Sequence, residues 1–293
     1  MGGAVADIIN YHVRHSVNIG DFVSSPLSYF EIPGRQSELR DIDELLQPSL
    51  GASDRIIGGG GLLFPRFLKN LQQVRQQNPS GRVILWGVGQ QSYYDPSQSW
   101  RKFDYAPYLD GVDLVGIRDY DVGLPWVPCA SCMHPEFDRP RSPKHEVVVF
   151  SHKKFRLNIK GLPTFTNKQV DFRAVLDFLG SGDTILTSSF HGAYWGTLLG
   201  RRVLAFPFSS KFFGLKHRPG IYPIERWRPK HYKISVLGKT LYQRFSKTWF
   251  QCPTENWQDY LEDCPRYPES LAECRERNRQ FYEQVVELIN ASS

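Results

Sequence analysis

The sequence predicts an α/β fold built on parallel strands. Short β-branched runs alternate with amphipathic stretches along most of the 293 residues, which is the pattern of strands connected by helices. The alternation stops at the stiff, charged segment 139–143, Arg-Pro-Arg-Ser-Pro, and then restarts, so two α/β halves are expected. Hydrophobic residues make up 41% of the chain and charged residues 23%, which is enough apolar material to bury a core in each half.

The first half contains four apolar runs that predict buried strands, at 8–13, 54–57, 83–86 and 112–117. Four glycines, Gly58 to Gly61, follow the second run. We expect a tight turn there, or a close approach of the backbone to another group. One helix is predicted from about Phe22, and another over 67–77, where apolar residues recur at helical spacing before Asn-Pro stops them.

The second half repeats this alternation. Strands are predicted at 147–150, 184–187 and 202–206, with helices at 172–179 and 188–199. Near the end of the chain, Ser270 and Glu273 have the spacing of a capping box, which predicts the start of an amphipathic C-terminal helix.

The positive charge of the chain is concentrated in one block. The net charge is +6, yet residues 201–250 hold twelve Lys and Arg against Glu225 alone, together with eleven aromatic residues. Residues 251–293 are acidic, with nine Asp and Glu against four Arg. The basic block favours an anionic ligand, an anionic membrane surface or the acidic C-terminal segment as its partner.

Composition also indicates a compartment. No apolar stretch approaches the ~20 residues of a transmembrane helix, and the first residues lack the pattern of a secretory signal. The five cysteines are few and odd in number, which is typical of a reducing compartment. We therefore expect a cytoplasmic protein, peripheral at the inner face of the membrane at most. Cys129 and Cys132 have the spacing of half a zinc site, but no second pair matches them, so no metal is expected.

Polar residues at the exits of predicted strands are the candidate site, because open α/β sheets bind ligands beyond the carboxyl ends of their strands. His191 follows one strand at the predicted start of a helix, where the helix dipole would lower its pKa and prepare it for proton transfer. Arg118 follows another strand and could bind an anion through two hydrogen bonds. The alternatives are a histidine that merely bonds to the backbone and a surface ion pair of Arg118 with Asp119.

Several segments in order resemble the polysaccharide pyruvyl transferase family. They are Asn18-x-Gly20-Asp21, Ile56-Ile57-Gly58-Gly59-Gly60-Gly61, Trp86-Gly87-Val88-Gly89, Gly116-Ile117-Arg118-Asp119 and Thr187-Ser188-Ser189-Phe190-His191-Gly192, followed by Lys211 in a Phe-Pro-Phe-Ser-Ser-Lys segment. The resemblance implies two Rossmann-like domains facing a cleft, as in GT-B glycosyltransferases. It places an N-terminal domain at 1–141, a C-terminal domain with the donor site at 142–250, and an acidic helical segment at 251–293 that packs back on the N-terminal domain.

The activity implied is transfer of pyruvate from phosphoenolpyruvate to two hydroxyls of a sugar, giving a cyclic ketal and phosphate. The acceptor would be a surface polysaccharide or its lipid-linked precursor, with no metal or organic cofactor and no nucleic acid. The family pattern makes His191 the general acid and base and Arg118 the anchor of the donor. The other site residues it implies are Asn18, Gly20, Asp21, Gly59, Gly60, Gly61, Ser188, Ser189, Phe190 and Lys211, with Asp21 orienting the acceptor.

The sequence departs from the family at two places. Many members have Arg-Leu before the histidine, where this chain has Ser189-Phe190, so Lys211, Arg201 or Arg202 must supply the missing charge. A Pro-Cys-Ala-Ser-Cys-Met-His-Pro segment at 128–135 replaces a Gly-Asp-Pro-like turn.

Three other functions remain open from the sequence. The first is a GT-B glycosyltransferase that uses a nucleotide sugar. The second is a nucleic-acid-binding surface on the basic aromatic block, although no RNA-binding motif is present. The third is a glycan-binding protein without activity.

Overall fold

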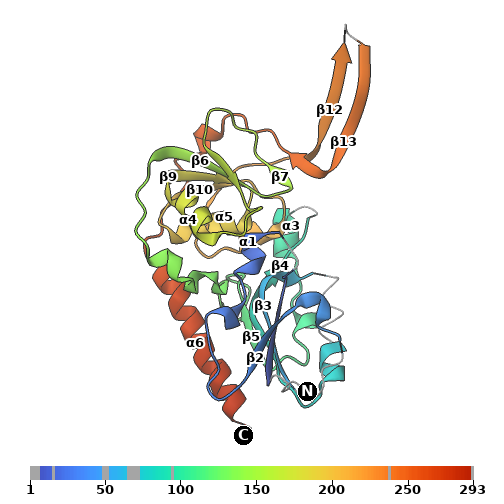
Figure 1. Cartoon of the computed structure of the whole chain (residues 1–293), viewed down its shortest axis with the longest axis vertical. Helices are drawn as coiled ribbons and strands as arrows, with labels where there is room; N and C mark the ends of the chain where they lie inside the picture. Colours follow the sequence, from blue (N-terminus) through green and yellow to red (C-terminus); the bar gives the residue numbers. More distant parts are fainter. Residues whose placement is uncertain are drawn as a thin grey trace. The chain divides into compact units, whose positions relative to one another are not determined.

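The computed structural model describes residues 7–14, 17–47, 53–64, 73–93, 96–236 and 239–291. The predicted α/β fold with parallel strands and a C-terminal helix is confirmed (Figure 1). The chain forms two compact units. Unit 1 comprises Met1–Arg139, Ser209–Arg218 and Pro268–Ser293, and unit 2 comprises Pro140–Phe208 and Pro219–Tyr267. Residues 209–218 thus belong with the N-terminal half of the chain, and residues 251–267 belong with unit 2.

Unit 1 is built on a parallel sheet with the strand order β2-β1-β3-β4-β5. These strands are β1 (Ile8–His12), β2 (Ser37–Asp41), β3 (Asp54–Leu63), β4 (Val83–Gln90) and β5 (Leu114–Ile117). Helical segments of this unit are α1 (Ile19–Phe22), η1 (Pro26–Ser28), η2 (Ile42–Glu44), α3 (Pro96–Arg101), η3 (Ala106–Tyr108), η4 (Ala130–Met133), η5 (Pro135–Asp138), η6 (Ser210–Gly214) and α6 (Ser270–Asn290).

Two predictions for this unit are wrong. The tight turn expected at Gly58 to Gly61 does not form, because β3 continues through them to Leu63. The alternative expectation, a close approach of the backbone to another group, is confirmed, since a Cβ at Gly59 would lie 2.3 Å from Ser24 Oγ. Gly59 and Gly60 adopt φ values of 81° and 101°, and the pairing register with β4 shifts after Gly60, so the glycines form an irregular part of the strand. The helix predicted from Phe22 is absent, since the four-residue α1 ends there and a 3-10 turn starts at Pro26. Of the helix predicted over 67–77, residues 73–77 are helical and 67–72 lie outside the described residues.

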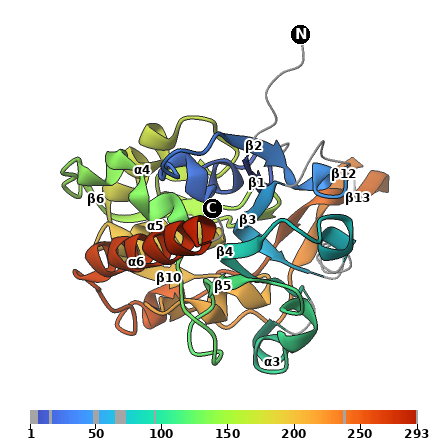
Figure 2. The ribbon, with the colours of Figure 1, turned by 90° about the horizontal axis from the view of Figure 1, so that it is seen from below.

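Helix α6 covers one face of this sheet (Figure 2). Its buried residues recur every three or four positions: Cys274, Asn278, Phe281, Val285 and Ile289. Phe281 meets Trp86 of β4 edge to face, with 5.2 Å between ring centroids. Asn278 accepts a hydrogen bond from Trp86 Nε1 at 2.9 Å and donates to the Pro128 carbonyl at 3.2 Å. The C-terminal helix therefore completes the core of unit 1.

The capping box predicted for α6 does not form. Helix α6 begins at Ser270, and its N-cap is Glu269. Glu273 instead accepts a hydrogen bond from His217 Nε2 at 2.9 Å and forms an ion pair with Lys216. These contacts join the segment 209–218 to α6.

Unit 2 contains a second parallel sheet, with the order β11-β10-β9-β6-β8. The strands are β6 (His145–Ser151), β8 (Thr164–Thr166), β9 (Gly182–Thr187), β10 (Arg202–Ala205) and β11 (Gly220–Ile221). Helices α4 (Phe172–Gly180) and α5 (Phe190–Leu198) pack on this sheet. The short helix η7 (Trp257–Tyr260) lies in the last segment of the unit. All nine residues of α5 are buried. A Cβ at Gly192 would lie 2.5 Å from the Phe150 ring, so glycine lets the start of α5 approach the sheet.

A long antiparallel hairpin also belongs to unit 2 and was not predicted from the sequence. Strands β12 (Arg228–Val236) and β13 (Lys239–Gln251) pair with each other, and the end of β13 pairs with the two-residue β7 (Phe155–Arg156). Figure 1 shows the hairpin extending away from this base. The basic block of the sequence therefore includes this hairpin.

Replacing Asn278 with alanine should destabilise unit 1. The change leaves the buried indole N–H of Trp86 without its acceptor, which costs about 1–3 kcal/mol of unfolding free energy. Urea denaturation measures this loss. Gln280→Ala on the exposed face of α6 is the control, with an expected change within about 0.5 kcal/mol. Equal midpoints for the two variants would contradict the role of Asn278.

Candidate functional site

The carboxyl ends of β3, β4 and β5 bring together most of the site residues predicted in unit 1. Arg118 follows β5 and is 5% exposed, and its backbone N–H donates to the Val88 carbonyl of β4 at 2.9 Å. Its Nε lies 3.9 Å from Asp119 Oδ1, so the predicted pairing of the two residues exists but is buried. Burying a guanidinium costs free energy of desolvation, and buried charged groups of this kind are typical of functional sites.

Two glycines make room for this guanidinium. A Cβ at Gly89 of β4 would lie 2.5 Å from Arg118 Nε, and a Cβ at Gly61 of β3 would lie 3.3 Å from Nη2. A Cβ atom does not come within 3.0 Å of a neighbouring heavy atom without something shifting, so Gly89 must lack a side chain for Arg118 to hold this position. The resemblance to the family drew attention to Gly61, and the structure gives it a steric reason.

Asp119 is held by its own hydrogen bonds. Its Oδ2 accepts from the Gln90 backbone N–H at 2.7 Å and from the Tyr105 hydroxyl at 2.9 Å. Burial raises the pKa of Asp119 to about 6, although Arg118 acts in the opposite direction. Asp119 is therefore a positioning residue for Arg118. Asp119 was not predicted as a site residue from the sequence.

Lys211 lies at the same edge of the sheet, in unit 1, although the sequence analysis placed it in the second domain with His191. Its segment η6 is fixed to the end of β4, because Ser210 N donates to the Ser92 carbonyl at 2.8 Å and Ser210 Oγ donates to Gln90 Oε1 at 3.0 Å. The Lys211 ammonium donates to Gln91 Oε1 at 3.5 Å. Burial and the charge of Arg118 lower the pKa of Lys211 to about 7, while Asp21 acts to raise it.

Asp21, Asn18 and Gly20 form one small cap in unit 1. Asn18 is the N-cap of α1, where its Oδ1 accepts from Gly20 N at 3.3 Å and its Nδ2 donates to Asp21 Oδ2 at 2.8 Å. A Cβ at Gly59 would lie 2.3 Å from Ser24 Oγ, so β3 packs closely against the segment after α1. The charge of Asp21 influences Lys211, which places this cap near the two cations. A Cβ at Gly60 would meet only Leu62 Cγ among the described residues, at 4.0 Å.

His12 is a residue of this edge that the sequence analysis missed. It ends β1, is 2% exposed, and its Nδ1 lies 3.4 Å from the Asp21 carbonyl. Among the described residues, no hydrogen-bond partner reaches its Nε2. Burial lowers its pKa, so the ring is neutral at neutral pH. A polar residue at the exit of a buried strand was the available signal.

In unit 2, the predicted helix after β9 begins at Phe190, with Ser189 as its N-cap. Ser189 Oγ accepts from Gly192 N at 3.2 Å, and its own N–H donates to Thr187 Oγ1 at 3.0 Å. Ser188 Oγ accepts from His152 N at 3.0 Å and donates to the Phe155 carbonyl. Both serine hydroxyls thus shape the loop, and backbone N–H groups at the helix start are the groups that suit an anion.

His191 lies in the first turn of α5 and is 6% exposed. Its ring stacks on Trp195 at 5.0 Å between centroids and meets the Phe190 ring edge to face at 5.3 Å. These aromatic contacts fix the imidazole plane, and Phe190 acts by positioning it.

A second histidine, His152, follows the neighbouring strand β6. It is half-buried between the rings of Phe208 and Phe155, with centroid distances of 4.8 and 5.6 Å. The next residue, Lys153, donates its backbone N–H to Asn167 Oδ1 at 2.6 Å. Because β6 and β9 are adjacent parallel strands, His152 and Ser188 share one sheet edge. The polar run after the predicted strand 147–150 was the signal that could have identified His152.

Cys129 and Cys132 are buried and contact polar side chains. Cys129 Sγ lies 3.2 Å from Ser131 Oγ, and Cys132 Sγ lies 3.4 Å from Asn278 Nδ2. Burial raises the pKa of the Cys129 thiol, which disfavours the thiolate a metal requires. Within the described ranges, no group of three or more His, Cys, Asp or Glu residues could hold a metal ion.

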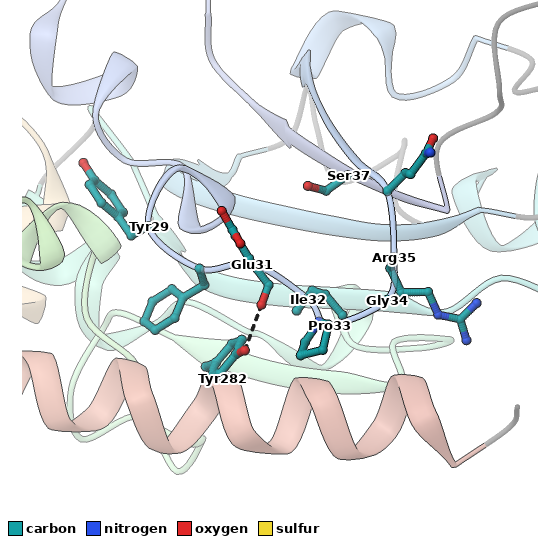
Figure 3. Close-up of a pocket in the computed structure, with 10 residues that line it drawn as sticks. Tyr29, Glu31, Ile32, Pro33, Gly34, Arg35, Ser37 and Tyr282 are labelled. Atoms are coloured by element: carbon teal, nitrogen blue, oxygen red, sulfur yellow. Dashed lines mark hydrogen bonds between the residues drawn. The ribbon is translucent and has the colours of Figure 1, made fainter.

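A pocket of about 800 Å³ lies elsewhere in unit 1 (Figure 3). Residues 29–37 and Tyr282 line it, and Tyr282 donates a hydrogen bond to the Glu31 carbonyl at 2.8 Å. It reaches Ser37, where β2 begins, so it lies at the amino edge of the sheet, opposite the Arg118 edge. None of the predicted site residues lines it.

Comparison with known proteins identifies no family. No protein-family model matches the chain, and no curated protein matches it. A crystal structure of a functionally uncharacterised protein from Klebsiella pneumoniae is similar over 69% of this chain and 84% of that chain, with 16% sequence identity and a TM-score of 0.41. In the part of the chain that the structure describes, no helix is long and apolar enough to cross a membrane.

The pKa of Lys211 predicts a pH-dependent stability. Between pH 7 and about 10.5 the unfolded chain carries a proton on this amine that the folded chain lacks, so folding becomes more favourable as the pH rises. Wild type should therefore gain stability relative to Lys211→Met over this range, measured by urea denaturation. A constant difference between the two proteins would show that the ammonium is not buried.

Proposed function

We propose that the protein is a polysaccharide pyruvyl transferase, which transfers pyruvate from phosphoenolpyruvate to a sugar. The observation that carries this proposal is that Arg118 and Lys211 both lie beside Gly61 and Gln91 at the carboxyl edge of the first sheet. A Cβ at Gly61 would lie 3.3 Å from Arg118 Nη2 and 2.7 Å from Gln91 Oε1, the atom to which Lys211 Nζ donates at 3.5 Å. Two cations on rigid supports suit a small trianion. The sequence resemblance described above supports the same activity, and a GT-B-like pair of Rossmann-like domains facing a cleft is part of the proposal.

Lys211 fits the role left by the missing arginine before Phe190. Its pKa of about 7 means that the amine is partly neutral without a ligand. A bound phosphate or carboxylate would raise that pKa and hold the ammonium form, so the charge would appear when the donor binds. The Arg118 guanidinium can hold the second anionic group through two hydrogen bonds.

The reaction needs one proton transfer to carbon. His191 gives a proton to the methylene carbon of phosphoenolpyruvate, and the neighbouring carbon then accepts the oxygen of the first sugar hydroxyl, whose proton returns to His191. The second hydroxyl displaces phosphate from that carbon, and its proton leaves with the phosphate. The product is a methyl-bearing cyclic ketal, so atoms and charge balance without a metal or an organic cofactor.

Acceptor choice belongs to the same proposal. Asp21 orients a hydroxyl of the acceptor, with its carboxylate held by Asn18 Nδ2 and the Asn18 amide held in turn by the Gly20 N–H. The acceptor is a surface polysaccharide or its lipid-linked precursor.

His191→Ala should lower phosphate release from phosphoenolpyruvate in the presence of sugar glycosides by about 10²–10⁴-fold, because general acid–base catalysis contributes this much. His145→Ala is the matched control, since His145 is exposed at the amino end of β6. Release that is equal in both variants would refute the assignment of His191. Assays with a nucleotide sugar as the donor, in place of phosphoenolpyruvate, test the glycosyltransferase alternative.

Gly89→Ala should weaken phosphoenolpyruvate binding although it removes no cationic residue, because the new Cβ would displace the Arg118 guanidinium. The variant should raise the KM in the same direction as Arg118→Ala. Thermal stabilisation by phosphoenolpyruvate measures the binding without any acceptor. Unchanged stabilisation in both variants would mean that the donor binds elsewhere.

A further inference from the structure

The hairpin β12–β13 is the most basic element of the chain. Between Arg228 and Gln251 it holds six Lys and Arg residues and no Asp or Glu. It also holds five aromatic residues, two of which are tyrosines. Within the described residues, β13 pairs outside the hairpin only through Phe250 and Gln251, with β7. The remainder of the hairpin therefore offers its strands to no other element of the sheet (Figure 1).

The base of the hairpin is firmly attached to unit 2. Phe250 of β13 stacks on Phe155 of β7 with 5.2 Å between ring centroids. Phe155 also stacks on Phe208 at 4.0 Å and meets Trp227 edge to face at 5.2 Å. An aromatic cluster of this kind fixes the direction in which a hairpin leaves its domain.

Next to the base, aromatic and basic side chains lie side by side on the hairpin. Phe245 is 56% exposed, and its ring stacks on His231 at 4.6 Å. The Lys230 ammonium lies 4.1 Å from the centroid of the Trp249 ring. Arg228 and Lys247 are exposed, and they form no ion pair in the part of the chain that the structure describes. Exposed aromatic residues beside unneutralised cations are typical of surfaces that bind the interface of a membrane.

The aromatic rings of this surface already have partners on a ring face. Phe245 stacks on His231, and the Trp249 ring centroid lies 4.1 Å from the Lys230 ammonium and 5.1 Å from the Arg156 guanidinium carbon. The bases of a single strand bind by stacking on such faces, whereas a membrane interface needs only exposed apolar area beside cations. The surface therefore favours an anionic membrane over a nucleic acid.

We propose that the hairpin β12–β13 docks the protein on a membrane surface that contains anionic phospholipid headgroups. The basic residues bind the headgroup phosphates, and the exposed Phe245 ring enters the boundary between headgroups and acyl chains. Docking itself does not depend on the transferase activity. It gains a purpose from the proposed function, because Phe155 of the base also accepts the hydrogen bond of Ser188 at the candidate donor site. A docked hairpin would thus hold that sheet edge close to a lipid-linked acceptor.

Co-sedimentation with vesicles tests the proposal. The full chain should bind vesicles of phosphatidylcholine with phosphatidylglycerol, and should not bind vesicles of phosphatidylcholine alone. The triple variant Lys233→Glu, Lys239→Glu and Lys247→Glu should lose about 100-fold in affinity, since each cation near such a surface contributes about fivefold. The control triple, Lys102→Glu, Lys144→Glu and Lys160→Glu, changes three exposed lysines and the net charge equally, and it should keep most of the binding.

Further measurements separate the possible partners. Phe245→Ser should weaken vesicle binding with no change in its dependence on salt, because it removes apolar contact and no charge. Equal loss in the two triple variants would overturn the proposal, as would binding of both vesicle types alike. If the hairpin triple variant lost binding to a single-stranded oligonucleotide but kept binding to vesicles, the hairpin would be assigned to nucleic acid instead.

The docking proposal and the proposed transferase activity can be refuted independently of each other. With a water-soluble glycoside as acceptor, the hairpin triple variant should release phosphate at the wild-type rate, because it leaves the candidate site unchanged. Vesicle binding without phosphate release by wild type would refute the transferase and leave the docking surface intact. Phosphate release by wild type without vesicle binding would refute the docking surface and leave the transferase proposal intact.

Discussion

Unit 1 depends on the burial of the Arg118–Asp119 pair at the carboxyl edge of its sheet. Removing a guanidinium from water costs several kcal/mol, and a single carboxylate 3.9 Å away does not offset that cost by itself. The protein offsets it by fixing Asp119 with the Gln90 N–H and the Tyr105 hydroxyl. It also leaves Gly89 without a side chain beside the guanidinium. The buried charge also affects Lys211, whose pKa is lowered first by its own burial and then by Arg118.

Much of the fold could be predicted from apolar runs, because buried parallel strands are nearly continuous in hydrophobic residues. The predictions failed where the physical signal is different. Strand β2 is partly exposed and charged, so its sequence, Ser-Glu-Leu-Arg-Asp, carries no apolar run. The glycines of β3 indicate a turn by composition, yet the close packing of Ser24 requires them inside a strand. The β12–β13 hairpin was not predicted for a similar reason, since its sequence is rich in Lys and Arg and lacks the long apolar run of a buried parallel strand.

The candidate site was predictable only in part. A polar residue after a buried strand is a local signal, and it led to Arg118 and His191. Lys211 carries no such signal, because its place beside Arg118 depends on the hydrogen bonds of Ser210 to Ser92 and Gln90, far away in the chain. His12 and His152 had the local signal and were still missed. The residues of a site that come from distant segments are therefore the ones that only a structure can supply.

The position of α6 has a consequence for biosynthesis. Phe281, Val285 and Ile289 complete one apolar face of a sheet whose strands all lie before residue 118. During translation that face stays uncovered while more than half of the chain is made, whereas the five strands of the second sheet emerge within a shorter stretch, 145–221. The first unit to be synthesised is thus the last to be completed, and its exposed Trp86 surface is a natural target for chaperones.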